Sequence, residues 1–212
     1  MISYEEISVK FNNNYVIKDL DLKIEKDEKI IIAGQSGIGK TTLLYLLLGF
    51  VIPDKGRVIF NGKSISHKNI WSIRKNFAYI SQDVNIGKGK VIDIINRYFE
   101  LKANSGIIFD SDESNRLFEK FSLSTELLKK DVDELSGGER QRVSIIISIM
   151  LKRNVFLLDE ATSALDSKLK KKVIDYFLNK KDSTVIAISH DELWRDKKNV
   201  RIYNLEKKKW VH

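Results

Sequence analysis

The 212-residue sequence contains no cysteine, which excludes disulfide bonds and thiolate metal sites and suits a reducing compartment. Its single proline and its lack of low-complexity tracts leave no obvious linker, so we expect one domain whose internal divisions are subdomain boundaries. The longest apolar stretches, residues 43–51 and 143–151, fall well short of the roughly 20 residues that a membrane-spanning helix needs. The N-terminus also lacks the basic and apolar regions of a signal peptide, which favours an intracellular protein.

Positive charge is in excess but is not concentrated in one segment. The formal net charge of +8 would suit a nucleic acid, an anionic membrane surface or a polyphosphate ligand. The lysines form short scattered runs, such as residues 129–130, 170–172 and 207–209, without the interleaved aromatic residues that nucleic-acid readers show. We therefore interpret these runs as solvated faces and expect no nucleic-acid partner.

Short apolar runs that alternate with helical patterns indicate an α/β fold. Strands are expected at residues 2–11, 16–25, 29–33, 57–60, 77–80, 155–158 and 184–188, with two more within 200–211. Helices are expected from about residue 40, over 138–151 and 168–178, and at several places in the polar segment 83–134. We predict an α/β core with an antiparallel β edge subdomain in residues 1–82 and 152–212, and an inserted helical subdomain in residues 83–151.

Residues 34–42, with the sequence GQSGIGKTT, match the phosphate-loop pattern G-x-x-x-x-G-K-[ST] between an apolar strand and a helix. The glycines let backbone N–H groups turn inward around a β-phosphate, whose charge is also favoured at the helix N-terminus. Lys40 is expected to reach the β- and γ-phosphates, and the Thr41 hydroxyl is expected to bind Mg²⁺. The alternative is a plain glycine-rich turn, which this strand–loop–helix context disfavours.

An acidic pair ends the apolar run Val155–Leu158. Phosphoryl transfer needs a carboxylate that holds the metal, and Asp159 is placed for this role at the end of a buried strand. Glu160 follows immediately and is expected to accept a proton from the attacking water. The alternative is a solvated strand end, which the apolar run before the pair makes less favourable.

The segment Leu-Ser-Gly-Gly-Glu, residues 135–139, lies between these two motifs and precedes an apolar helix. Taken alone, it could be a helix-capping turn. In this order between a phosphate loop and Leu-Leu-Asp-Glu, it resembles the signature motif of the ABC ATPase family, which is LSGGE or LSGGQ. The resemblance covers nearly the whole chain and implies a P-loop NTPase core of the ABC type.

The resemblance also implies roles for residues elsewhere in the chain. Gln82 matches the glutamine that senses Mg²⁺ and the attacking water and links to a transporter partner, and His190 matches the switch histidine on the γ-phosphate. Residues 163–166 match a loop that touches the opposite subunit, and the adenine is expected to stack on Phe11, with Tyr15 as the competitor. The implied nucleotide contacts are Phe11, Gly34, Gln35, Ser36, Gly37, Ile38, Gly39, Lys40, Thr41, Thr42, Ser136, Gly137, Gly138, Glu139 and Asp166. The implied catalytic residues are Lys40, Gln82, Glu160 and His190, and the implied metal ligands are Thr41, Gln82 and Asp159.

The function implied by the resemblance is ATP hydrolysis coupled to transport. Two copies, or this chain and a related cassette, would form a head-to-tail dimer with ATP and Mg²⁺ sandwiched between them, on the cytoplasmic face of the membrane beneath separate membrane-spanning subunits. Residues 83–95 partly resemble an exporter pattern, which gives a mild preference for export. The alternatives are a soluble ABC ATPase acting on nucleic acid, ribosomes or cluster assembly, and a nucleotide-gated assembly module with negligible turnover, against which Glu160 argues.

Overall fold

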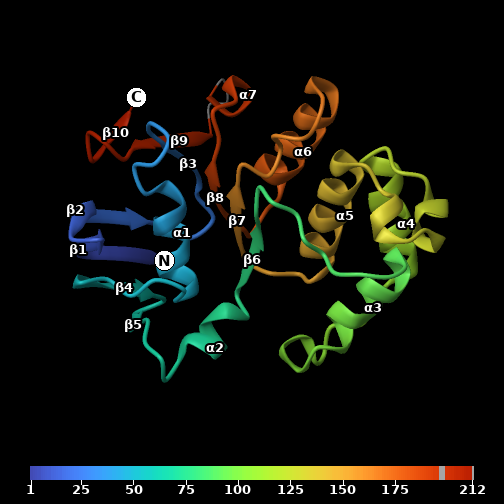
Figure 1. The fold of residues 1–212 in the computed structure, drawn as a ribbon, viewed down its shortest axis with the longest axis horizontal. Helices are drawn as coiled ribbons and strands as arrows, with labels where there is room; N and C mark the ends of the chain where they lie inside the picture. Colours follow the sequence, from blue (N-terminus) through green and yellow to red (C-terminus); the bar gives the residue numbers. More distant parts are fainter. Residues whose placement is uncertain (196–198, 212) are drawn as a thin grey trace.

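Strands and helices alternate along most of the chain in the computed structural model, which describes residues 1–195 and 199–211 (Figure 1). The strands are β1 (Ile2–Phe11), β2 (Asn14–Ile24), β3 (Lys29–Ala33), β4 (Lys55–Phe60), β5 (Lys63–Ser64), β6 (Phe77–Ile80), β7 (Val155–Asp159), β8 (Thr184–Ile188), β9 (Val200–Asn204) and β10 (Lys209–Val211). The α-helices are α1 (Lys40–Leu48), α2 (Ile70–Arg74), α3 (Val91–Glu100), α4 (Ser111–Lys120), α5 (Gly137–Met150), α6 (Ser167–Asn179) and α7 (Glu192–Arg195). Short 3₁₀ turns cover Lys102–Asn104, Thr125–Lys129 and Val132–Glu134.

The strands form two sheets. The larger sheet has the order β10-β9-β3-β8-β7-β6, in which β6, β7, β8, β3 and β9 run parallel and β10 pairs antiparallel with β9. The smaller sheet is antiparallel, with the order β2-β1-β4-β5. The parallel strands therefore place their carboxyl ends along one edge, where ligands of open α/β sheets commonly bind.

The apolar strands of the larger sheet bury side chains on both faces, because successive side chains point to opposite sides. On β3, Ile31 joins one hydrophobic cluster while Ile30 and Ile32 join the other. The first cluster contains the apolar faces of α3, α4, α5 and α6. The second contains α1 and the smaller sheet, so α1 lies between the two sheets (Figure 1). Each face of the larger sheet is thus covered, which explains why its strands are nearly continuous apolar runs.

The predicted α/β fold class is confirmed, and most predicted strands and helices agree with the structure to within two residues. The N-terminal hairpin does not extend the edge of the parallel sheet but forms a sheet of its own with β4 and β5. The sequence did not predict β5, α2 or α7, which have two, five and four residues and are too short to show a periodic pattern. Among the described residues no helix has the length and apolar character to cross a bilayer.

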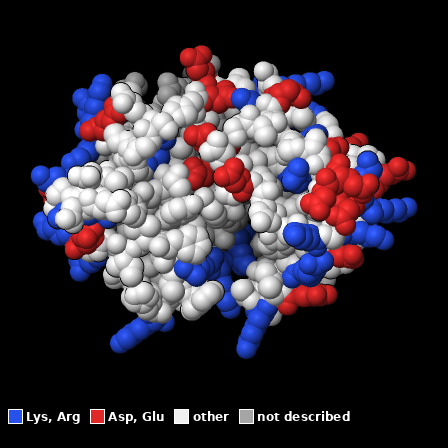
Figure 2. Space-filling view, in the orientation of Figure 1, with Lys and Arg blue, Asp and Glu red and all other residues white. Residues whose placement is uncertain are grey.

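Charged side chains of both signs are dispersed over the surface. In Figure 2, lysine and arginine side chains lie around the rim of the visible face, on its right half and below its middle, interspersed with acidic ones, and a broad uncharged area covers much of its left half. Some of these charges also cap helices. Asp110, the N-cap of α4, accepts hydrogen bonds from the backbone N–H groups of Asp112 and Glu113.

Candidate functional site

The loop between β3 and α1 has a left-handed backbone, which favours glycine, at two of its turns. Gly37 (φ 80°) and Gly39 (φ 98°) are in left-handed conformations, and Gly39 is the N-cap of α1. A Cβ on Gly39 would lie 2.7 Å from Cγ1 of Val16 on β2, so a side chain there would also collide with the smaller sheet. The loop thereby enters α1 with the first backbone N–H groups of the helix facing outward, which is the arrangement that binds phosphate.

Lys40, the first residue of α1, is buried. Its Nζ donates to the backbone carbonyl oxygens of Gly34 (2.9 Å) and Gln35 (2.7 Å). A buried ammonium group needs such acceptors, because burying an unpaired charge is costly. The side chain therefore lies folded over the loop, where phosphate oxygens could take the place of these carbonyls.

Asp159 ends β7 at the same sheet edge as the loop. β7 is not the direct neighbour of β3, since β8 lies between them, but the register aligns Ile188 with both Asp159 and Ile32. The Thr41 hydroxyl donates to Oδ1 of Asp159, and the Tyr79 hydroxyl donates to Oδ2, each at 3.2 Å. Burial raises the pKa of the Asp159 carboxyl, and the hydrogen bonds from these two hydroxyl groups partly oppose this shift.

The polar groups around Asp159 suit a magnesium ion. Thr41, Gln82 and Asp159 line one cavity, and the 3.2 Å contact between the Thr41 hydroxyl and Asp159 brings two of the three groups within reach of one cation. All three offer oxygen atoms, which Mg²⁺ prefers, and one carboxylate together with substrate phosphates is a common way to hold it. The predicted metal-ligand set is therefore chemically consistent, and its role stays a prediction.

Glu160 turns the chain sharply after β7. It adopts a left-handed φ of 49°, and its backbone N–H donates to the carbonyl oxygen of Ile188 at 3.0 Å. Its Oε1 lies 3.9 Å from Nε2 of His190, which follows β8 and has a side chain that is 58% exposed. A left-handed conformation costs a non-glycine residue about 1–2 kcal/mol, and the bond to Ile188 helps to hold it. The two side chains thus meet at the carboxyl edge of the sheet.

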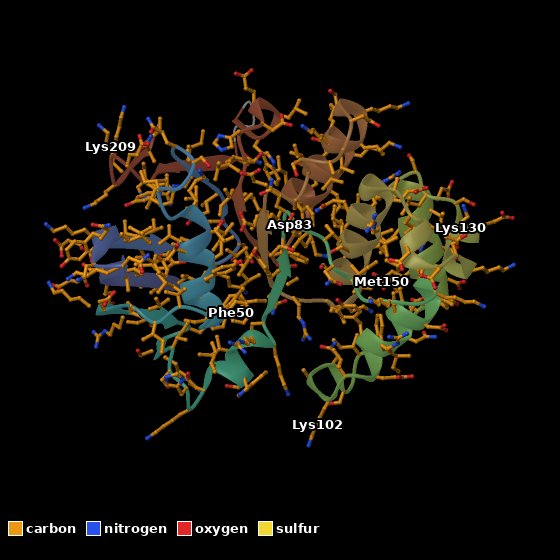
Figure 3. All side chains as sticks on the ribbon, in the orientation of Figure 1. Phe50, Asp83, Lys102, Lys130, Met150 and Lys209 are labelled. Atoms are coloured by element: carbon orange, nitrogen blue, oxygen red, sulfur yellow. The ribbon has the colours of Figure 1, made fainter. Side chains whose placement is uncertain are left out.

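A cavity of about 340 Å³ joins these parts and contains most of the predicted site. Its lining residues are Phe11, Val16, Ser36, Gly37, Gly39, Lys40, Thr41, Thr42, Gln82, Asp159, Glu160 and Ile188. Glu160 also lines an adjoining cavity of about 240 Å³ together with His190. Gln82 lies in the loop after β6, next to Asp83, which Figure 3 labels near the middle of the molecule. The structure therefore brings together the phosphate loop, both acids and Gln82.

Two exposed aromatic residues of the hairpin formed by β1 and β2 were the candidates for stacking on the adenine. Phe11, at the end of β1, is 47% exposed and lines the cavity beside Val16. Tyr15, on β2, is 50% exposed, and the ammonium groups of Lys10 and Lys18 lie 4.5 and 5.5 Å from its ring centre. Tyr15 is absent from the cavity lining. The position of Phe11 agrees with the predicted stacking role, which remains a prediction.

The predicted signature residues form the start of α5 and are separate from this cavity. Ser136 is the N-cap, and it shares a capping box with Glu139, whose backbone N–H donates to the serine Oγ at 3.3 Å. In return, the backbone N–H and the hydroxyl of Ser136 each donate to Oε2 of Glu139 at 2.8 Å. These bonds lower the pKa of the Glu139 carboxyl, the hydroxyl of Ser136 having the largest effect. One copy of the chain thus does not place Ser136, Gly137, Gly138 or Glu139 beside its own phosphate loop.

The signature turn lies against the loop that follows β7. A Cβ on Gly138 would approach the carbonyl oxygen of Ala164 to 3.1 Å, so glycine permits this close contact. Asp166 caps α6 by accepting from the backbone N–H of Leu169 at 2.9 Å, and it is exposed. The predicted partner-facing segments, residues 136–139 and 163–166, therefore occupy neighbouring positions on one chain.

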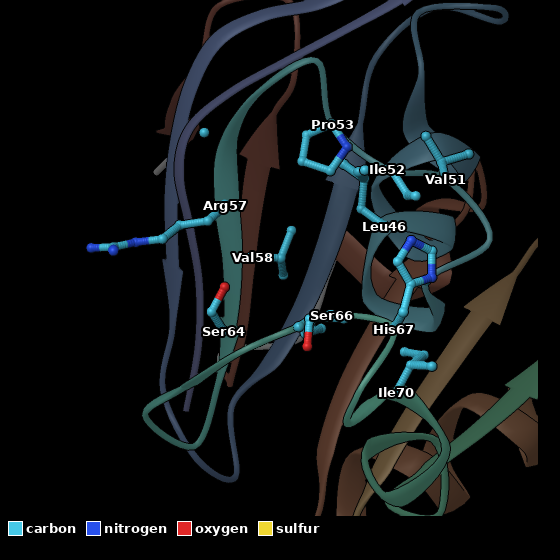
Figure 4. Close-up of a pocket in the computed structure, with 13 residues that line it drawn as sticks. Leu46, Val51, Ile52, Pro53, Arg57, Val58, Ser64, Ser66, His67 and Ile70 are labelled. Atoms are coloured by element: carbon cyan, nitrogen blue, oxygen red, sulfur yellow. The ribbon is translucent and has the colours of Figure 1, made fainter.

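A second, more apolar cavity of about 290 Å³ lies on the side of α1 that faces β4, β5 and α2 (Figure 4). Leu46, Ile52, Val58 and Ile70 line it, and His67 lies at its border. None of its lining residues belongs to the phosphate loop. An apolar lining does not suit a triphosphate, whose charges need N–H groups and cations, so this cavity is not the candidate nucleotide site.

A family model described as "ABC transporter" matches residues 17–163 of this sequence, a span that begins in β2 and ends just after the acidic pair. The chain belongs to the ABC transporter family. The resemblance drawn from the signature motif is thereby confirmed.

Several curated ABC transporter proteins align over most of this chain. The ergothioneine transport ATP-binding protein of Helicobacter pylori is 34% identical, and the alignment covers 91% of each chain. The molybdate/tungstate import ATP-binding protein of Methanocaldococcus jannaschii is 32% identical over 86% of this chain and 60% of its own length. The putative export ATP-binding/permease protein of Rickettsia typhi is 33% identical over 89% of this chain and 34% of its own. This chain spans only about a third to three fifths of the length of the latter two relatives.

Solved ABC structures share the fold. A bacterial Atm1-family ABC exporter with ATP bound matches with a TM-score of 0.81 at 22% identity, over 96% of this chain and 37% of that chain. An ATP-binding cassette, solved as a dimer in a post-hydrolysis state with ADP and Pi, matches with a TM-score of 0.80 at 20% identity, over 97% and 95% of the two chains. These similarities confirm the predicted ABC ATPase fold.

The sequence did not predict two polar residues that lie beside the candidate nucleotide site. Tyr79 bonds to Asp159, and Gln141 of α5 is 1% exposed with its Nε2 3.5 Å from the carbonyl oxygen of Ser81, next to Gln82. Burial raises the pKa of Tyr79 strongly, and interactions with Tyr45 and Asp159 add to this shift. The sequence does place Tyr79 on the strand just before Gln82, and this position could have marked it as a candidate. Its contact with Asp159 could not be predicted, because that contact depends on the register between β6 and β7.

Proposed function

We propose that this chain binds ATP in the cavity at the carboxyl edge of its larger sheet and hydrolyses it. The observation that carries the proposal is the convergence of three elements on one cavity. The phosphate loop supplies Lys40 at the start of α1, the end of β7 supplies Asp159 and Glu160, and the loop after β6 supplies Gln82. Membership of the ABC transporter family supports the same chemistry.

Each side chain has a role that its position supports. Lys40 would exchange its two carbonyl partners for phosphate oxygens and so neutralise their charge. Thr41, Gln82 and Asp159 would hold Mg²⁺, which supplies charge stabilisation to the phosphate oxygens. Glu160 would accept a proton from the attacking water, with the imidazole of His190 3.9 Å from its carboxylate. Phe11 would stack on the nucleobase at the open side of the cavity.

We further propose that ATP is enclosed between two copies of the chain, or between this chain and a related cassette. Support comes from the separation of the signature turn from the cavity, since residues 136–139 do not line it. In a head-to-tail pair, the signature turn of one copy would cover the phosphate loop of the other. Asp166 and its neighbours, which lie beside that turn, would then face the second copy.

We also propose a membrane-spanning transport subunit as a partner, which would hold the chain at the cytoplasmic face of the membrane. The relatives carry transport names, and these include both import and export proteins, so we propose transport without a direction. Residues 83–151 would form the helical subdomain, and residues 1–82 and 152–212 would form the core with its antiparallel β subdomain.

A surface of exposed apolar side chains supports a protein partner. Phe50, Ile52 and Trp71 are 59%, 63% and 74% exposed, and the Arg74 guanidinium lies 4.7 Å from the ring centre of Phe50 and 4.9 Å from that of Trp71. Exposed apolar side chains that cluster in this way commonly mark interaction sites. Phe50 lies below the middle of the molecule in Figure 3.

The test combines two substitutions with ATPase and binding measurements. Glu160→Gln keeps the size of the side chain but cannot accept a proton, so turnover should fall by about 10²-fold or more while ATP still binds and drives dimer formation in size-exclusion chromatography. Lys40→Ala removes charge-assisted hydrogen bonds and should weaken ATP binding about 10- to 100-fold in calorimetry.

Lys102→Ala is the matched control, because Lys102 is an exposed lysine at the lower edge of the helical side, far from the cavity (Figure 3). It should leave affinity and turnover unchanged. Undiminished turnover in Glu160→Gln would remove Glu160 from its proposed role, and unchanged ATP affinity in Lys40→Ala would refute the phosphate-loop assignment.

A further inference from the structure

Tyr79 points toward the proposed metal carboxylate because of the strand register. Tyr79 of β6 lies opposite Leu157 of β7 in the parallel pairing. Side chains alternate along a strand, so Leu157 and Asp159 project from the same face of the sheet. Leu157 and Tyr79 both belong to the cluster covered by α1, which is also the helix that carries Thr41. The register therefore brings Tyr79, Asp159 and Thr41 together from three elements.

The two oxygens of the Asp159 carboxylate have different hydroxyl partners. Thr41 donates to Oδ1 and Tyr79 donates to Oδ2, each at 3.2 Å. If Thr41 directs its hydroxyl oxygen at a metal ion, its hydrogen bond to Oδ1 of Asp159 no longer fixes the carboxylate. Tyr79 is then the hydroxyl group that still fixes the rotation of the carboxylate about its χ2 angle.

The ring of Tyr79 is itself held in place by a residue of α1. Tyr45 packs its ring edge-on against Tyr79, with ring centres 6.1 Å apart. Tyr45 follows Thr41 by four residues and therefore lies on the same face of the helix. The helix that supplies the expected metal ligand Thr41 thus also positions the ring that supports Asp159.

We propose that Tyr79 is a positioning residue of the magnesium–ATP site, whose hydroxyl holds Oδ2 of Asp159 so that Oδ1 stays directed at Thr41, with which it would hold the metal. This inference rests on the proposed function. Hydrogen-bond partners of ligating carboxylates typically change metal affinity or activity by about 10- to 100-fold when they are removed. Loss of the Tyr79 hydroxyl should therefore weaken the metal's contribution to ATP binding without changing how the loop binds phosphate.

The experiment measures that contribution directly. In the Glu160→Gln background, which slows turnover by about 10²-fold or more, the dissociation constant of ATP is measured once with excess EDTA and once with excess Mg²⁺. The ratio of the two constants reports the gain from the metal. Tyr79→Phe keeps the ring against Tyr45 and should lower this ratio about tenfold, while the constant in EDTA stays within about twofold of the parent.

Tyr4→Phe is the matched control. Tyr4 is also a buried tyrosine bonded to α1, through its hydroxyl and the carbonyl oxygen of Leu43 at 2.9 Å, but it does not touch Asp159. It should lower the melting temperature and leave the ratio unchanged. A ratio in Tyr79→Phe equal to that of the parent, in a folded protein, would overturn the role of Tyr79 alone. A parent protein that binds no ATP, or gains nothing from Mg²⁺, would instead overturn the proposed function and this inference with it.

Discussion

Replacement of Gly39 by alanine tests whether the phosphate loop depends on its contact with the smaller sheet. Gly39 has a φ of 98°, and an added Cβ would lie 2.7 Å from Cγ1 of Val16 and 3.1 Å from Cγ1 of Ile17. Val16 is β-branched and has little rotational freedom, so it cannot turn away easily. The left-handed backbone costs alanine about 1–2 kcal/mol, and overpacking adds about 1–3 kcal/mol. We expect Gly39→Ala to lower the free energy of unfolding by about 2–5 kcal/mol.

Gly37→Ala provides the comparison within the same loop. Gly37 has a φ of 80°, but an added Cβ would meet no atom within 4 Å. This variant therefore carries only the backbone cost of about 1–2 kcal/mol. Both proteins are unfolded with urea without nucleotide, because a methyl group on the loop could also disturb a bound phosphate. Equal losses of stability in the two variants would show that the contact with Val16 is relieved at no cost, and the reasoning would be wrong.

Two further predictions concern the nucleobase and the signature turn. Phe11→Ala should weaken ATP binding at least several-fold because Phe11 lines the cavity, whereas Tyr15→Ala should have little effect; the reverse order in a fluorescence titration would reassign the stacking residue. Glu139→Gln keeps a capping box but loses the charged acceptor, so it should cost about 1 kcal/mol at neutral pH. Because the folded protein lowers the pKa of Glu139, this stabilisation is present above the ordinary glutamate pKa and is lost as the pH falls through the folded value, so wild type and variant should converge in acid urea titrations. A difference in stability that persists below both pKa values would contradict this account.

Some parts of the site could be predicted from sequence because they are local. The phosphate loop combines a strand, a glycine-rich turn and a helix within a few residues, and the Asp159–Glu160 pair directly follows an apolar run. In such segments, the residue order and the backbone preferences of glycine already determine what the side chains can do. The meeting of these two segments at one sheet edge follows from a parallel sheet, since parallel strands place their carboxyl ends along the same edge.

Other features depend on pairing between distant segments. The sequence does not show that β8 separates β3 from β7, or that the N-terminal hairpin pairs with β4 to form its own sheet. The family resemblance already favoured Phe11 over Tyr15, but the reason that Phe11 lines the cavity and Tyr15 does not lies in how that second sheet packs against the phosphate loop. The short helices α2 and α7 have too few turns to be recognised from periodicity.

The sequence by itself determined the fold class and the family, and it predicted the chemical groups of the candidate site, because each motif is a continuous stretch with its own backbone requirement. Only the tertiary structure decided which of these groups touch. The bond from Tyr79 to Asp159 and the position of the signature turn away from its own phosphate loop both arise from strand register and helix packing. Shifting β6 by one residue against β7 would turn Tyr79 to the opposite face of the sheet, and no local feature of its sequence would reveal the change.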